Sequence, residues 1–434
     1  MKLSLSVLFV LLLGACSPKP ATTTPATEPT TPQAENPQAM HIDTAHIDQV
    51  LGAFVEKDKL VGVSALIYQQ GEEAYFGTFG MADREANKPM QRDTIVRLYS
   101  MTKPVTGVAL MILFEEGKFA LDDPLAKYLP EFAEPRVYVG MVDGEPAYEP
   151  AHRPISVYDI LRHSAGFAAE ADSTPVGQLY AKAEPFNREH TLAEMIKRLS
   201  QVPLVFQPGR QWLYGPSVDV QARLVEVLSG QSFTEFLQTR LFDPLQMHDT
   251  GHFVPEEKRE RLAQLYQWYE DDRFFPANEQ TANSDYFKHW PLRRGGSGLT
   301  STLDDYMRFA RMLNNGGELD GVRILQPETL ALMTTDALGE NVPERSWLPN
   351  KGQVGFGINF AVRLAPPANT EEASGMVGEF FWDGYSNVLF WVDPQNDLTA
   401  LLFTQYIPFG SIDLHKPFRD AVYLHHPKAS ALTR

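Results

Sequence analysis

The sequence predicts an α+β protein, an α/β sandwich in which an antiparallel sheet is flanked by helices and carries an inserted, mostly helical lobe. Two observations support this. Apolar segments with strand character gather near both ends of the globular region, whereas helix-like segments lie between them. Because strands joined by short turns pair in antiparallel fashion, one sheet is expected to form from both ends of the chain.

The first two strands are expected at 61–69 and 73–80, where they flank Gln70-Gly71 as a hairpin. Further strands are expected near the C-terminus, at 354–362, 376–382, 387–392 and 398–406. Helices at about 44–57 and 413–424 would cover the sheet. Shorter helices of the inserted lobe are expected at 157–162, 192–199, 218–228 and 233–241. A cleft between two lobes is a natural place for a binding site.

Composition divides the chain into three parts. Residues 1–16 have the charged start and short apolar run of a secretory signal, and 17–40 form a Pro- and Thr-rich tether that cannot bury enough surface to fold. Residues 41–430 are expected to form the folded domain. Its α/β lobe would comprise about 41–120 and 297–430, and its helical lobe about 121–296.

Cys16 is the only cysteine, so no intramolecular disulfide can form. The end of the signal, Leu13-Gly14-Ala15-Cys16, resembles the lipobox of bacterial lipoproteins, which implies lipidation of Cys16 and export to a bacterial membrane, facing the periplasm or the cell surface. The alternative is a cleaved signal of a soluble protein with an incidental cysteine.

The formal net charge is −17, and removal of the signal, whose one charged residue is Lys2, makes it −18. An acidic surface without a Lys/Arg-rich stripe repels phosphate backbones, so nucleic acid is not an expected partner. A small-molecule ester or amide substrate is expected instead, and no obligate protein partner is evident.

Ser100 and Lys103 form the only Ser-x-x-Lys in the chain. Residues three apart share one helical face, so the lysine can act as the base that a serine nucleophile needs. Pro104 and the apolar run that follows it predict a buried helix beginning at this point. The alternative interpretation is that Ser100 caps the helix and Lys103 is solvated.

Two other segments could line the same cleft. Tyr214 lies in a turn-rich loop ahead of a helix, where its phenol could relay a proton beside a cation. Trp382-Asp383-Gly384 ends an apolar strand at a glycine, where a ligand could approach the backbone closely. The alternatives are a packing tyrosine and an ordinary strand end.

Together, these motifs resemble the serine β-lactamase-like and penicillin-binding-protein-like hydrolases, which have a β-lactamase/transpeptidase-like fold. Ser100-x-x-Lys103, Tyr214 and Trp382-Asp383-Gly384 occur in that family's order. The supporting stretches 161–167, 242–250 and 295–302 resemble its "LTHTSGL", "FxPLGMxDT" and "GGLxST" segments. The likeness runs from about 45 to 425 and is closest to class C β-lactamases and the carboxylesterases that share their fold.

The resemblance implies a role for each matching residue. Ser100 would be the nucleophile, Lys103 and Tyr214 would share general-base and general-acid duties, and the backbone amides of Ser100 and Tyr385 would form the oxyanion hole. Substrate-binding positions would be Trp382, Asp383, Gly384 and Ser217. The chemistry would be acyl transfer through an acyl-serine intermediate.

Departures from the family pattern favour an esterase. The Lys-Thr-Gly of β-lactamases is replaced by Trp382-Asp383-Gly384, so the cation is lost and Asp383 adds negative charge. An anionic β-lactam would be repelled unless Arg293 or Arg294 compensates. No amide side chain follows Tyr214, and only Ser217 could substitute. Uncharged or small-acyl esters are therefore the expected substrates.

Two alternatives stay open: a β-lactamase or D-alanyl-D-alanine carboxypeptidase, and a catalytically silent ligand-binding protein of the same fold. No cofactor is expected, because Gly296-x-Gly298-x-x-Ser301 follows no apolar strand and Thr302 with Asp305 is typical of a helix cap. No metal is expected, because the histidines lack ligand spacing.

Overall fold

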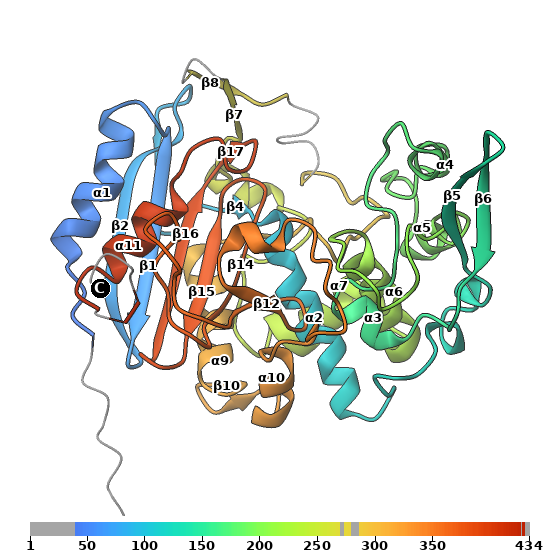
Figure 1. Cartoon of the computed structure of the whole chain (residues 1–434). Helices are drawn as coiled ribbons and strands as arrows, with labels where there is room; N and C mark the ends of the chain where they lie inside the picture. The colour runs from blue at the N-terminus through green and yellow to red at the C-terminus, as the bar shows by residue number, and fades with distance from the viewer. Residues whose placement is uncertain (1–39, 270–272, 279–285, 427, 430–434) are drawn as a thin grey trace, which may run out of the picture. The chain divides into compact units, whose positions relative to one another are not determined.

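An eight-stranded antiparallel sheet, in the order β12-β13-β14-β15-β16-β1-β2-β3, forms from both ends of the chain in the computed structural model (Figure 1). Its strands are β1 (Gly62–Gln69), β2 (Glu72–Asp83), β3 (Lys88–Pro89), β12 (Val354–Phe356), β13 (Ala361–Arg363), β14 (Phe380–Asp383), β15 (Leu389–Asp393) and β16 (Leu398–Thr404). The structure describes residues 40–269, 273–278, 286–426 and 428–429. The predicted signal, Cys16 and tether residues 17–39 lie outside these ranges.

Helices cover both faces of the sheet because neighbouring apolar residues on its strands point to opposite sides. On one face, Phe418 of α11 (His415–Val422) packs on Trp391 of β15, and α1 (Thr44–Glu56) lies beside α11. On the other, Tyr306 of α9 (Leu303–Asn314) packs on Phe390, the residue next to Trp391. Figure 1 shows α1 and α11 together on one side of the strands.

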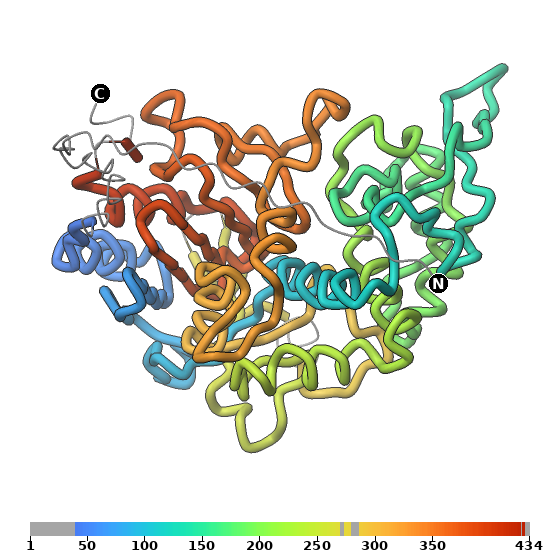
Figure 2. The backbone as a smooth tube through the Cα atoms, turned by 90° about the horizontal axis from the view of Figure 1, so that it is seen from below, coloured from blue at the N-terminus to red at the C-terminus, as the bar shows by residue number. Residues whose placement is uncertain are grey.

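The mostly helical lobe is formed by segments between residues 116 and 265. It contains α3 (Val157–Leu161), α4 (Pro175–Ala183), α5 (Leu192–Leu199), α6 (Ser217–Ser229) and α7 (Phe233–Leu237), together with the hairpin of β5 (Arg136–Val142) and β6 (Glu145–Pro150). Figure 2 shows α2 (Thr102–Glu115) running between this lobe and the sheet. Its residues from Thr102 to Leu113 are all buried, and it packs against α6, so the predicted buried helix is confirmed.

The remaining elements are small. They are β4 (Val96–Arg97) paired with β9 (Thr300–Ser301), β10 (Glu318–Leu319) paired with β11 (Val322–Arg323), α10 (Pro327–Met333), and a sheet of β7 (Tyr266–Tyr269), β8 (Arg273–Pro276) and β17 (Tyr406–Ile407). In the part of the chain that the structure describes, no helix has both the length and the apolar character needed to span a membrane.

Most predicted elements are present, with four differences. The predicted strand 376–382 is shorter, since β14 begins only at Phe380 and ends at Asp383. The predicted strand 354–362 is a hairpin of β12 and β13, because the chain turns at Asn359, which adopts a left-handed φ of 61°. The predicted strand 398–406 ends at Thr404, and Tyr406–Ile407 pairs instead with β7. The predicted helix 233–241 changes after Leu237 into a π-helical turn, Gln238–Phe242.

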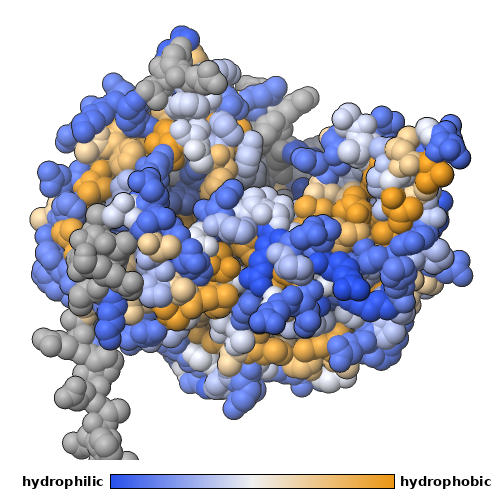
Figure 3. All heavy atoms as spheres, in the orientation of Figure 1, coloured by the Kyte–Doolittle hydropathy of each residue, from blue (hydrophilic) through white to orange (hydrophobic). Residues whose placement is uncertain are grey.

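The surface seen in Figure 3 is mainly hydrophilic, with apolar patches between the charged areas. One patch lies over the β5–β6 hairpin, where Val139, Met141 and Val142 are each more than half exposed. The hairpin projects at the edge of the helical lobe, away from the sheet (Figure 1).

Candidate active site

Ser100 lies in a single 3₁₀ turn, η1 (Tyr99–Met101), directly before α2. Tyr99 has φ +47°, a left-handed conformation that a bulky residue rarely adopts and that packing must maintain. The N-cap of α2 is Met101, and no side chain caps it. The alternative in which Ser100 caps the helix is therefore wrong.

Lys103 is buried, and its ammonium nitrogen contacts the predicted nucleophile. Nζ lies 3.1 Å from Ser100 Oγ and donates to the carbonyl oxygen of Gly296 at 2.6 Å. Burial lowers the pKa of Lys103 to about 7, and nearby Arg294 also lowers it, while Asp219 and Asp383 act in the opposite direction. At neutral pH a large fraction of Lys103 is thus an uncharged amine that can accept a proton.

Tyr214 completes a cluster of three. Its ring lies under Lys103, with Nζ 4.4 Å from the ring centroid, and the indole Nε1 of Trp382 donates to its hydroxyl at 3.2 Å. Burial raises the pKa of Tyr214, although hydrogen bonds with Ser100 and Trp382 lower it in part. The phenol is therefore protonated at neutral pH and can act as a donor.

The loop Gly295–Leu299 brings the Gly296 carbonyl to Lys103, and contacts from two helices hold this loop. From α2, Thr106 Oγ1 donates to Gly295 O at 2.8 Å. From α6, the Asp219 carboxylate accepts from the Gly296 amide at 3.1 Å and pairs with Arg294. A Cβ at Gly295 would lie 2.4 Å from Val218 O, so only glycine fits there.

Sequence reasoning missed Asp219 as a part of this site. The available signal was the Gly-Gly-Ser-Gly stretch, which was compared with the family loop but not linked to a buried acid on α6. Asp219 and Gly296 are 77 residues apart, so no local pattern joins them.

The end of β14 packs against the turn that carries Ser100. A Cβ at Gly384 would lie 2.2 Å from Leu98 O, and the Tyr385 ring stacks edge-on against Tyr99 at 5.7 Å. Ser386 Oγ donates to Arg97 O at 3.0 Å. These contacts bring the Tyr385 segment beside the Ser100 turn, and the role of both backbone amides as an oxyanion hole stays a prediction.

Asp383 does not carry an unbalanced charge. Its carboxylate pairs with Lys351, a residue that sequence reasoning missed. Arg294 pairs with Asp219, and the Arg293 guanidinium contacts His252 O and His289. Compensation of an anionic substrate by either arginine stays untested.

Ser217 is the first residue of α6 and is only 3% exposed. Among the described residues, no hydrogen bond joins its hydroxyl to Ser100, Lys103 or Tyr214. A substrate contact by Ser217 stays a prediction.

Two cavities are lined by neighbours of the cluster, although Ser100, Lys103 and Tyr214 themselves line neither. One, of about 320 Å³, is lined by Tyr99, Phe186, Trp290 and Ser297 among others. The other, of about 790 Å³, lies beside Asp383 and Lys351. Both are within the size range of small-molecule sites. In residues 40–269, 273–278, 286–426 and 428–429, no group of three or more His, Cys, Asp or Glu side chains could hold a metal ion.

Comparison with known proteins finds relatives that match most of this chain. The uncharacterized protein MT1414 of Mycobacterium tuberculosis is 34% identical over 359 residues, 82% of this chain and 88% of the relative. Esterase EstB of Burkholderia gladioli is 32% identical over 398 residues, 87% of this chain and 94% of the relative.

The solved structure of EstCE1, a hydrolase with promiscuous acyltransferase activity, superposes with a TM-score of 0.73 at 25% identity, covering 87% of this chain and 98% of EstCE1. Simvastatin synthase LovD from Aspergillus terreus, at 24% identity, shares the fold with a TM-score of 0.75 over 88% of this chain and 98% of LovD. Residues 47–420 match the Beta-lactamase family. The chain therefore belongs to the β-lactamase family and is a serine hydrolase.

Proposed function

We propose that this chain is an esterase that hydrolyses uncharged or small-acyl carboxylic esters through an acyl-Ser100 intermediate. The observation that carries the proposal is the contact between Ser100 Oγ and a Lys103 amine whose pKa is lowered to about 7. An uncharged amine 3.1 Å from a hydroxyl is placed to accept its proton.

We infer the following order of proton transfers. Lys103 takes the proton of Ser100 as Oγ attacks the ester carbonyl, and the amides of Ser100 and Tyr385 would stabilise the oxyanion. The protonated Tyr214 phenol then gives its proton to the leaving alkoxide and regains one from the Lys103 ammonium that lies over its ring. In the second step the Lys103 amine takes a proton from water as the water oxygen attacks the acyl carbonyl, and this proton passes to Ser100 Oγ as the C–O bond to the serine breaks and the acid leaves.

The β14 strand favours an ester over a β-lactam. Trp382 occupies the position of the lysine in Lys-Thr-Gly, and its indole donates to Tyr214. The nearby Lys351 cation is neutralised by Asp383, so this strand offers no free cation to a β-lactam carboxylate. The relative EstB, named as an esterase, is similar over 87% of this chain.

The test compares hydrolysis of p-nitrophenyl acetate and butyrate with that of a chromogenic cephalosporin, using the wild type and Ser100→Ala. The expected result is ester hydrolysis that Ser100→Ala abolishes, with cephalosporin turnover at least 100-fold lower in kcat/KM. Faster cephalosporin turnover would favour the β-lactamase alternative. Failure of Ser100 to react with esters, a fluorophosphonate or a penicillin probe would favour a binding protein.

We also propose that the chain is exported and attached to a bacterial membrane through lipid on Cys16, with the tether separating the membrane from the folded domain. The support is the signal-like residues 1–16 and the lipobox-like end. Metabolic labelling with an alkyne fatty acid, followed by membrane fractionation, tests this. Label and membrane association should disappear in Cys16→Ala, and a soluble, unlabelled wild type would refute it.

A further inference from the structure

Lys351 has surroundings unusual for a loop lysine. It ends the short 3₁₀ helix η6 (Leu348–Lys351), and its side chain is 10% exposed. Its ammonium pairs with the Asp383 carboxylate and lies 5.2, 4.9 and 5.3 Å from the ring centroids of Trp347, Trp382 and Phe409. Three aromatic rings and one carboxylate therefore surround this cation.

A salt bridge as enclosed as the Lys351–Asp383 pair is weak evidence that the pair stabilises the fold. The Asp383 side chain is 13% exposed, so both partners give up most of their hydration, which largely offsets their attraction. Cation–π contacts return part of that cost when the ammonium is desolvated. The pair is therefore more informative about which neighbouring segments it holds together than about the stability of the fold.

The segment carrying Lys351 contacts two groups of the proposed mechanism. Through Lys351 it reaches Asp383, the last residue of β14 and two residues before Tyr385. Through Trp347 it reaches the Tyr214 ring at 5.2 Å and the Trp382 ring at 6.2 Å. This segment thus packs against both β14 and the predicted proton donor, which Trp382 of β14 also contacts directly.

We propose that Lys351 is a positioning residue for acyl transfer, which fixes the Asp383 end of β14 and the Trp347–Trp382 wall so that the Tyr385 amide and the Tyr214 hydroxyl face Ser100. This inference rests on the proposed function. Lys351 touches neither Ser100 nor Lys103 in any contact of the described residues, and so acts through Asp383 and the aromatic rings.

The test measures kcat and KM for a p-nitrophenyl ester, and the rate of Ser100 labelling by a fluorophosphonate, in Lys351→Met and Lys351→Arg. Misalignment of the oxyanion amide weakens the transition state more than the ground state. Lys351→Met is therefore expected to lower kcat and the labelling rate roughly 10- to 100-fold with KM changed less than threefold. Lys351→Arg keeps the charge that pairs with Asp383 and should therefore lose clearly less than Lys351→Met.

Lys127→Met is the control. Lys127, at the end of the 3₁₀ helix η2 (Leu125–Lys127), also pairs with a carboxylate, Asp123, and lies 4.9 Å from the ring centroid of Tyr128, but none of these residues belongs to the candidate site or lines either cavity. Its kcat should stay within twofold of the wild type. An equal loss in Lys127→Met, no loss in Lys351→Met, or a loss in Lys351→Arg as large as in Lys351→Met would overturn the proposal.

If Lys351→Met does not fold, Lys351→Gln replaces it, since glutamine keeps a donor but no charge. A folded Lys351→Gln with wild-type kcat and labelling rate would overturn the inference, and a three- to tenfold loss would support it. A wild type that neither hydrolyses esters nor labels at Ser100 would overturn the proposed function as well, so the two failures are distinguishable.

Discussion

At the scale of single residues, the site depends on keeping one lysine uncharged. Among the described residues, the hydrogen-bond partners of Lys103 Nζ are Ser100 Oγ and the Gly296 carbonyl oxygen, and neither is a carboxylate. Desolvation therefore dominates, and the more distant charges of Asp219 and Arg294, which pair with each other, adjust the result. A full carboxylate contact would have kept the amine protonated.

The first prediction concerns the pH dependence of ester hydrolysis. Because Lys103 acts as a base only when deprotonated, kcat/KM should rise about tenfold per pH unit below about 7 and level off above it. The measurement is kcat/KM from pH 5 to 9 in a buffer of constant ionic strength. A profile that is flat between pH 5.5 and 8 would contradict a Lys103 base.

The second prediction concerns the rising limb of this pH profile, the part below about pH 7 where kcat/KM increases with pH. Arg294 lowers the pKa of Lys103 and neutralises Asp219, which raises it. Arg294→Gln removes both effects, so the limb should shift to higher pH, by roughly half a unit to one unit. Asp219→Asn should shift it to lower pH. Shifts in the same direction, or none in either variant, would contradict this account of the charges around Lys103.

Motifs in the sequence were enough to predict that Ser100, Lys103 and Tyr214 come together, because each belongs to a local pattern. Lys351 was not predictable in this way. Its partner Asp383 is 32 residues away, and only the folded chain shows that three aromatic rings surround it. The left-handed conformation of Tyr99 was equally invisible, since propensities assign positive φ to glycine and asparagine rather than tyrosine.

At the scale of elements, the turn after β14 decides where the Tyr385 amide lies. The third prediction is that Gly384→Ala lowers kcat roughly 100- to 1,000-fold, the cost of losing an oxyanion donor, because the new methyl group would meet Leu98 O at 2.2 Å and push the turn away.

Steady-state kinetics and a thermal melt together check this. Gly52→Ala in α1 is the control, because a Cβ there would lie 3.6 Å from Phe79, an ordinary contact, and alanine favours a helix. It should keep full activity. Wild-type kcat in Gly384→Ala would remove this turn from the mechanism.

Periodicity predicted the hairpin of β1 and β2 and helices α1, α5 and α6, which have clear alternation or amphipathic faces. It missed the β12–β13 turn because that turn is buried and contains no exposed polar run. Asn359 at the turn donates to the Lys103 carbonyl at 3.1 Å and to Gln221 at 2.7 Å. The apolar segment 354–362 therefore turns at Asn359 because this residue makes tertiary hydrogen bonds to α2 and α6.

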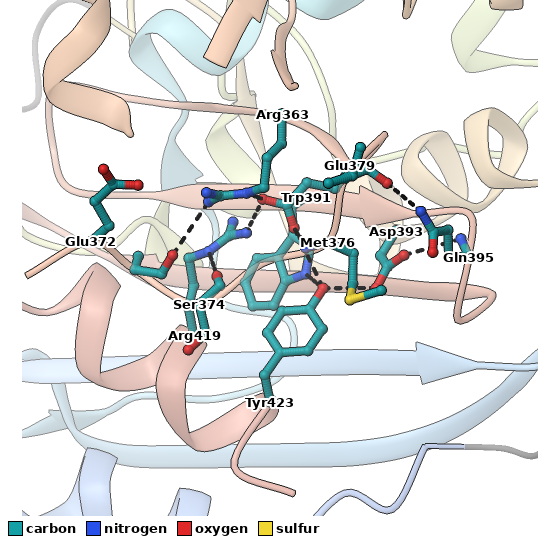
Figure 4. A network of polar contacts seen from close by, with 12 residues as sticks. Arg363, Glu372, Ser374, Met376, Glu379, Trp391, Asp393, Gln395, Arg419 and Tyr423 are labelled. Carbon is teal, nitrogen blue, oxygen red and sulfur yellow. Dashed lines mark hydrogen bonds and ion pairs between the residues drawn. The ribbon is translucent and has the colours of Figure 1, made fainter. Parts of the chain in front are cut away.

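At the scale of the whole molecule, the last segments of the chain are fixed to the sheet by a buried polar network (Figure 4). Glu379, just before β14, accepts from Arg363 of β13 at 2.8 Å and from Arg419 of α11. Nearby, Tyr423 Oη donates to Asp393 at 2.9 Å and accepts from Trp391. Two guanidiniums therefore share one carboxylate on the α11 face, on the opposite side of the sheet from α9.

The charge count of this network leads to the fourth prediction. Glu379→Gln leaves two buried guanidiniums without the carboxylate that they both contact and should destabilise the fold by about 3–5 kcal/mol. Arg419→Met leaves Arg363 and Glu379 as a matched pair and should cost clearly less, even though it removes more atoms. The measurement is the urea midpoint of each variant, with the slope of the transition checked for constancy.

Ester hydrolysis at low temperature provides the control, because folded Glu379→Gln should retain activity if the network only holds α11 and the C-terminal segment to the sheet. The opposite order of stabilities would mean that packing of the Arg419 stem on Phe381 and Trp391, whose ring centroids lie 5.3 and 4.6 Å from its guanidinium carbon, outweighs charge balance. The order of two midpoints thus decides whether electrostatics or packing joins α11 and the C-terminal segment to strands β13, β14 and β15.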